Sequence, residues 1–79
     1  MKNKGPGKYL KNDPFLKKVG DNIRTYRKAK GLTIEQFANE SGLDYSQLSR
    51  MELGKVGFNI IYLPKVAEAL DIPIELLIK

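Results

Sequence analysis

The segment TIEQFANESGLDYSQLSRME, residues 33–52, most constrains how this chain can fold. Thr33 followed by Gln36 has the spacing of a capping box, which predicts the start of a helix. Asp44 is suited to cap a second helix. Gly42, between them, can adopt the positive φ that ends one helix and redirects the chain. The segment therefore predicts two short helices joined by a tight turn.

The apolar and polar positions of this segment give the second helix two distinct faces. Leu48 and Met51 are expected to face a shared core, and the small Ala38 removes bulk where the two helices cross. Two helices joined in this way form a helix-turn-helix, which usually places its second helix in the major groove of DNA. An ordinary polar helix face is the alternative. The candidates for reading base edges are Tyr45, Ser46, Gln47 and Arg50.

Helical spacing predicts three further helices around this motif. One spans residues 13–31, and it contains a glycine, Gly20, that either weakens the helix or permits a close contact. Asn59 is expected to cap a fourth helix, in which Pro64 removes one backbone hydrogen bond and kinks the helix start. A last short helix is expected over residues 74–78. No strand pattern is visible, so the predicted fold class is all-α with five helices.

Positive charge is concentrated in the first part of the chain. The formal net charge is +5, but residues 1–30 hold ten Lys and Arg against two Asp, whereas residues 31–79 hold four against seven acids. A polyanionic partner such as nucleic acid is the natural interpretation. Residues 1–12 are predicted to be a basic flexible N-terminal tail before a domain over residues 13–79. This tail could contact the duplex, or it could only solubilise the protein.

The composition argues against several functional classes. Cys and His are absent, so the common zinc-ligand sets and nucleophile–base pairs cannot be assembled. We therefore expect no catalytic residues, no metal, no cofactor and no enzymatic activity. No apolar run approaches the roughly 18 residues of a membrane span, so we expect no membrane partner and a cytoplasmic, nucleoid-associated location. A chain of 79 residues leaves no room for a sensor domain, so no small-molecule ligand is expected.

Four segments in a fixed order resemble a known family: VGDNIRTYRKAKGLT, FANESGL, QLSRMELGK and LPKVAEALDIPIELL. Over residues 19–77 the chain resembles the Cro/CI-type (Xre-like) helix-turn-helix domain of phage repressors and bacterial regulators. The resemblance implies a five-helix, lambda-repressor-like DNA-binding domain whose recognition helix covers about residues 44–52. It also implies an ion pair between Arg27 and Glu52. The residues support this pair independently, because Glu52 lies among apolar residues, where an unpaired carboxylate would be costly.

The chain departs from the family at the start of the second helix. Ile34 occupies the position where many members have a glutamine that touches a phosphate, so this side-chain contact is lost. The backbone amides at the same helix N-terminus could still bind a phosphate. The predicted phosphate contacts are Thr33, Lys55 and Asn59, although Lys55 could equally be a free loop lysine.

Apolar residues near the C-terminus exceed what one small core needs. They predict a two-fold homodimer that reads half-sites about 34 Å apart on a palindromic operator. The predicted dimer residues are Ile61, Ile72, Ile74, Leu77 and Ile78. We predict a sequence-specific regulator of transcription that binds double-stranded DNA, of bacterial or phage type. A repressor, a restriction–modification controller and an antitoxin autoregulator all remain open. The alternative is an antitoxin or adaptor-type module that binds a partner protein through this apolar surface.

Overall fold

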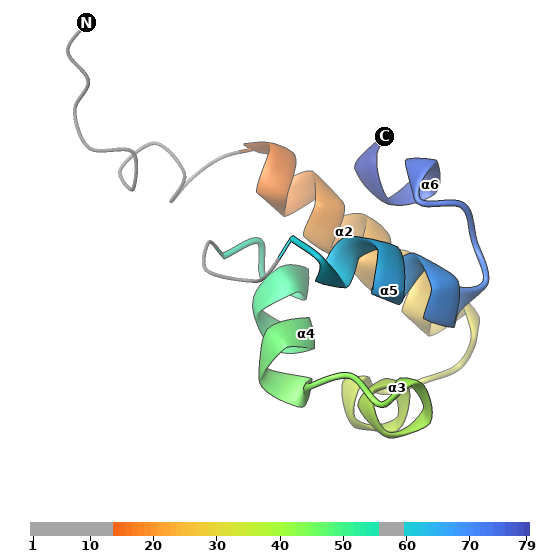
Figure 1. Cartoon of the computed structure of the whole chain (residues 1–79). Helices are drawn as coiled ribbons and strands as arrows, with labels where there is room; N and C mark the ends of the chain where they lie inside the picture. Colours follow the sequence, from red (N-terminus) through yellow and green to blue (C-terminus); the bar gives the residue numbers. More distant parts are fainter. Residues whose placement is uncertain (1–13, 56–59) are drawn as a thin grey trace, which may run out of the picture.

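The computed structural model describes residues 14–55 and 60–79, and these fold into five helices (Figure 1). The described residues contain no strand, which confirms the all-α prediction. Helix α2 is central, because it contacts α4, α5 and α6, while α3 packs against α4. The helices are α2 (Pro14–Ala29), α3 (Ile34–Ser41), α4 (Tyr45–Glu52), α5 (Tyr62–Leu70) and α6 (Glu75–Ile78).

All five helices contribute to one apolar core. Its members recur at helical spacing, so that each helix turns one apolar side inward. Each fully buried aliphatic or aromatic side chain stabilises the fold by about 1.5–3 kcal/mol. The core residues are Val19, Ile23, Phe37, Ala38, Leu48, Met51, Leu63, Val66, Ala67, Leu70 and Leu77.

The predicted caps of α3 and α4 are present. The Gln36 backbone N–H donates to Thr33 Oγ1 at 3.0 Å, and the Thr33 N–H donates to Gln36 Oε1 at 2.9 Å, which completes the capping box. Gly42 has a φ of 76° and ends α3 in the left-handed conformation. The Asp44 carboxylate accepts a hydrogen bond from the Gln47 N–H at 3.0 Å and caps α4. The two helices and their tight turn therefore form as predicted.

The start of α5 differs from the prediction. The helix begins at Tyr62, which places Pro64 within its first turn. The N–H groups of a first turn have no acceptor inside the helix, so a proline there removes no helical hydrogen bond. The expectation that Pro64 costs a helical hydrogen bond is therefore wrong. Asn59, which was predicted to cap this helix, lies outside the described residues.

The last helix, α6, has only four residues and packs against α2. Leu77 is 0% exposed and belongs to the core. The Asn22 side-chain amide in α2 donates a hydrogen bond to the Leu77 carbonyl at 2.9 Å. The prediction that Leu77 belongs to an exposed dimer surface is therefore wrong, because its side chain is already buried within one copy.

Candidate nucleic-acid interface

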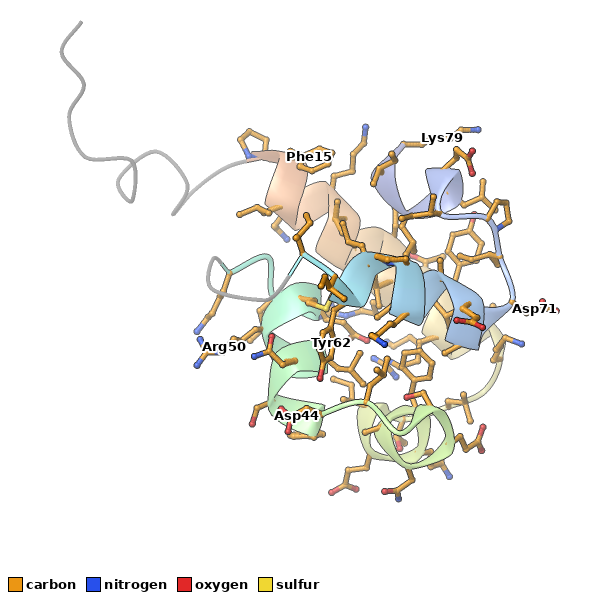
Figure 2. All side chains as sticks on the ribbon, viewed as in Figure 1. Phe15, Asp44, Arg50, Tyr62, Asp71 and Lys79 are labelled. Atoms are coloured by element: carbon orange, nitrogen blue, oxygen red, sulfur yellow. The ribbon has the colours of Figure 1, made fainter. Side chains whose placement is uncertain are left out.

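The exposed face of α4 carries the residues that were predicted to read bases. Leu48 and Met51 are fully buried, which turns the opposite side of the helix outward. Tyr45 is 51% exposed, and Ser46 and Arg50 are also exposed. In Figure 2 the Arg50 side chain extends away from the body of the domain. These three side chains offer a phenol, a hydroxyl and a guanidinium, each able to form hydrogen bonds with DNA.

Two residues at the edges of this face refine the prediction. Gln47 is only half-buried and lies at one edge, so it is less accessible than its neighbours. Ser49 is also half-buried on this side of α4, and it was not among the predicted residues. It follows Tyr45 by four residues and Ser46 by three, so all three lie on the same side of the helix. That spacing was visible in the sequence and could have identified Ser49.

Two of the three predicted phosphate contacts lie at the two ends of the helix-turn-helix. Thr33 is exposed at the start of α3, and Lys55 is exposed just after α4. The Lys55 backbone N–H donates to the Arg50 carbonyl at 3.0 Å, so the chain turns back on the end of α4 at this residue. Asn59 lies outside the described residues.

The N-terminus of α3 combines features that favour and disfavour a phosphate. Ile34 is half-buried and packs against the core, so it replaces a polar contact with an apolar one. The N–H groups of Thr33 and Gln36 are taken by the capping box, which leaves those of Ile34 and Glu35 for an outside acceptor. The exposed Glu35 carboxylate opposes a phosphate at this place.

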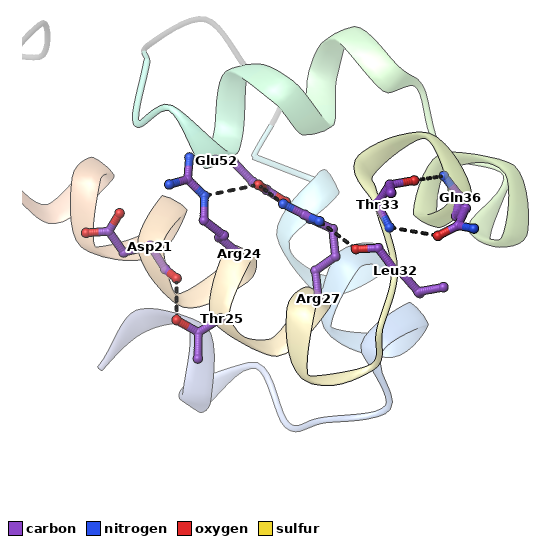
Figure 3. A network of polar contacts seen from close by, with 8 residues as sticks. All are labelled: Asp21, Arg24, Thr25, Arg27, Leu32, Thr33, Gln36 and Glu52. Carbon is purple, nitrogen blue, oxygen red and sulfur yellow. Dashed lines mark hydrogen bonds and ion pairs between the residues drawn. The ribbon is translucent and has the colours of Figure 1, made fainter.

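The ion pair between Arg27 and Glu52 is confirmed (Figure 3). Arg27 Nε donates to Glu52 Oε2 at 2.6 Å, and Arg27 Nη2 donates to Glu52 Oε1 at 2.9 Å. Both residues are buried, and Arg27 Nη1 also donates to the Leu32 carbonyl at 2.6 Å. The hydrogen bonds to Glu52 raise the pKa of Arg27 above its usual value despite the opposing effect of burial. The pair thus joins the end of α2 to the end of α4.

Gly20 allows the backbones of α2 and α4 to come into direct contact. A Cβ added at Gly20 would lie 2.4 Å from the Met51 carbonyl oxygen and 2.6 Å from that of Glu52. Of the two roles considered for this glycine, the structure supports the close contact. A Cβ at Gly54, where φ is 73°, would lie 2.9 Å from the Cα of Lys17. The C-terminal end of α4 is therefore seated directly on α2.

Tyr62 connects the other end of α4 to α5, a contact that the sequence did not predict. The Tyr62 hydroxyl accepts a hydrogen bond from the Asp44 backbone N–H at 3.4 Å. Figure 2 shows Tyr62 on α5 beside the start of α4. The two residues are eighteen positions apart, so no local spacing could have identified this contact.

Apart from the buried Leu77, the predicted dimer residues divide into two groups. Ile61 is 55% exposed and Ile78 is 41% exposed, whereas Ile72 and Ile74 are half-buried against the core. Three other apolar residues are exposed: Phe15, Leu53 and Ile60, of which Ile60 is 68% exposed. The exposed apolar surface therefore includes the start of α5 as well as the C-terminus.

The described residues show neither a membrane-spanning helix nor a metal site. Within residues 14–55 and 60–79, no helix is long and apolar enough to cross a membrane. In the same part of the chain, no group of three or more acidic residues could hold a metal ion.

Comparison with known proteins finds a helix-turn-helix family and two regulators of transcription that this chain resembles. A family model described as helix-turn-helix matches residues 23–77. The HTH-type transcriptional regulator SlrR of Bacillus subtilis (strain 168) is 42% identical over 55 residues, which are 68% of this chain and 36% of that protein. The HTH-type transcriptional repressor RghR of the same strain is 38% identical over 61 residues, 76% of this chain and 45% of that protein. The chain thus spans less than half the length of both relatives.

Solved structures resemble the domain over most of their length. The restriction-modification controller protein C.AhdI from Aeromonas hydrophila is 40% identical, with a TM-score of 0.70 over 78% of this chain and 94% of that one. SinR, described as the master regulator for biofilm formation and solved in complex with DNA, is 32% identical, with a TM-score of 0.69 over 77% of this chain and 98% of that one. These matches agree with the five-helix arrangement and with the helix-turn-helix formed by α3 and α4. The chain therefore belongs to the Cro/CI-type (Xre-like) helix-turn-helix family.

Proposed function

We propose that this protein is a sequence-specific regulator of transcription that inserts α4 into the major groove of double-stranded DNA. The observation that carries the proposal is the exposed polar face of α4 on a helix that is held at both ends. An α-helix with its side chains is about 10–12 Å wide, and the major groove is about 12 Å wide. The fit brings Tyr45, Ser46 and Arg50 to the base edges.

The comparisons support this function. Both curated relatives are named as regulators of transcription, one of them as a repressor. SinR was solved in complex with DNA, and its solved chain is covered almost completely by this one.

Each residue of the interface has a proposed role. Arg50 binds a guanine through two hydrogen bonds, Gln47 binds an adenine, and Tyr45 contacts a thymine methyl group or a phosphate. Ser46 contributes a further hydrogen bond to a base edge. Phosphates are bound by Thr33, Lys55 and Asn59.

We further propose that the protein binds as a two-fold homodimer on a palindromic operator. Ile61 and Ile78 supply exposed apolar surface for the second copy, and the half-buried Ile72 and Ile74 border it. Two-fold symmetry would place the two α4 helices in successive major grooves, about 34 Å apart. Sedimentation that shows only monomer at tens of micromolar, with and without DNA, would contradict the dimer.

Selection of bound sequences from a random duplex pool tests the function. We expect enrichment of one palindromic sequence, which would support both specific binding and two-fold symmetry. A pool that stays random after several rounds would contradict specific recognition. That result would favour a module that binds a partner protein, although burial of Leu77 already reduces the apolar surface available for such a role.

A further inference from the structure

Three cations line one edge of α2. Lys17, Arg24 and Lys28 are separated by seven and four residues, so they lie within about 40° of one another around the helix. All three are exposed. We call these three residues the basic edge. It borders the side of α2 where Gly20 and Arg27 contact α4.

The acidic groups nearest Arg24 leave its guanidinium available to a further anion. Glu52 is buried, and each of its oxygens already accepts a hydrogen bond from Arg27. Arg24 forms an ion pair with Glu52, from Nε to Oε1 at 3.6 Å, but this distance is too long for a hydrogen bond and the Arg24 side chain is 45% exposed (Figure 3). Asp21, the other acid nearby, pairs with Lys17 at 3.7 Å. Arg24 can therefore bind another anion while the hydrogen bonds between Arg27 and Glu52 stay in place.

The basic edge lies beside the helix that we place in the groove. A helix of about 10 Å diameter nearly fills a groove about 12 Å wide, so the elements on either side of it meet the sugar–phosphate backbone. The backbone contact at Gly20 holds α2 against the C-terminal end of α4. Figure 3 shows Arg24 beneath that end of α4, with Thr33 at the start of α3 farther along the same side of the domain.

We propose that the basic edge binds the DNA strand that borders α4 on this side, with Arg24 and Lys28 on successive phosphates and Lys17 at its end. Arg24 and Lys28 are four residues apart, or about 6 Å along the helix axis. One strand carries a phosphate about every 3.4 Å of duplex axis, so two long side chains about 6 Å apart can each reach a different phosphate of the same strand. This inference deepens the proposed function and depends on it.

The salt dependence of DNA binding tests whether the basic edge contacts phosphates. Arg24→Gln should lower the affinity for the selected operator and for an unrelated duplex by similar factors, because phosphates carry no sequence information. Losing one phosphate contact reduces the slope of log affinity against log salt by about 0.9. The ratio of wild-type to variant affinity should therefore shrink about 3.5-fold between 50 mM and 200 mM salt. Arg24→Lys should keep the wild-type slope.

Lys18→Gln is the matched control. It removes one positive charge from an exposed residue of the same helix, about 120° around the axis from Arg24. We expect this control to keep the wild-type slope and melting temperature. If Arg24→Gln changes the slope no more than Lys18→Gln, the phosphate role is wrong. A lower melting temperature with an unchanged slope would also overturn it, because Arg24 would then act only on the fold. If the wild-type protein binds no duplex at all, the proposed function itself is wrong. If the wild-type protein binds DNA and only the slope test fails, the proposed function stands and only the phosphate role of the basic edge is wrong.

Discussion

Replacing Gly20 with alanine tests how far the stability of the domain depends on the close contact between the α2 and α4 backbones. Two effects of opposite sign compete. Alanine is the better helix former, and in an open helix interior it would stabilise by about 0.5–1 kcal/mol relative to glycine. Here the new Cβ would lie 2.4 Å and 2.6 Å from two carbonyl oxygens of α4.

Steric repulsion should exceed the propensity gain. An ordinary contact between such atoms is longer than about 3.4 Å, so α2 and α4 must separate by nearly 1 Å. Both obstructing atoms are backbone oxygens, so no side-chain rotation can relieve the clash. Overpacking of this kind costs about 1–3 kcal/mol, and the rigid backbone places this site at the upper end. We expect a net loss of about 2 kcal/mol, which lowers the melting temperature by about 8–16 °C in a domain of this size.

Thermal unfolding followed by circular dichroism measures the effect. Asn39→Ala in α3 is the control, because Asn39 is exposed and alanine there raises helix propensity without filling a contact. The control should melt at or slightly above the wild-type temperature. If Gly20→Ala also melts at or above the wild-type temperature, the α2–α4 contact does not limit the fold and our account of α4 is wrong.

Three further experiments test other parts of the domain. Arg27→Met removes both hydrogen bonds to the buried Glu52 carboxylate and leaves it only the longer contact with Arg24, so urea unfolding should show a loss of up to about 3–5 kcal/mol. Adding Glu52→Leu should recover much of that loss, and failure to recover would contradict the buried-charge argument. Because the pKa of Arg27 is raised, its contribution to stability is complete at neutral pH and is lost only as the pH rises through the strongly alkaline range. Arg50→Ala should weaken operator binding by about 1–3 kcal/mol and relax preference at one base pair, and a uniform loss on every duplex would instead assign Arg50 to a phosphate. Asp71 ends α5 at a φ of 61°, a left-handed conformation that glycine adopts with less strain. Asp71→Gly should therefore raise the free energy of unfolding by about 0.5–1 kcal/mol. A lower urea midpoint than that of the wild type would refute this.

The sequence predicted the helix-turn-helix well because its signals are local. The capping box at Thr33, the cap at Asp44 and the turn at Gly42 each depend on residues within one helical turn, and all three form. The outward direction of Arg50 followed from the burial of Leu48 in the same way. Short-range spacing determines these features, so they need no knowledge of the tertiary structure.

Other features depend on contacts between distant parts of the chain, and local spacing could not determine them. Leu77 appeared to be surplus apolar surface because nothing local shows that α6 folds back onto α2. Tyr62 carried no signal because its partner lies eighteen residues away. Pro64 was misjudged because its effect depends on where α5 begins, and the start of α5 has no side-chain cap to mark it.

The orientation of α4 follows from its short length and its tertiary contacts. A helix of eight residues is marginal on its own, so its stability must come from its surroundings. Asp44 and Tyr62 hold its first turn, while Gly20 and the Arg27–Glu52 pair hold its last turn. Substitutions on the exposed face should therefore change sequence preference and leave the melting temperature nearly unchanged. Substitutions at either end should lower stability and DNA affinity together, because the same contacts form the helix and position it in the groove.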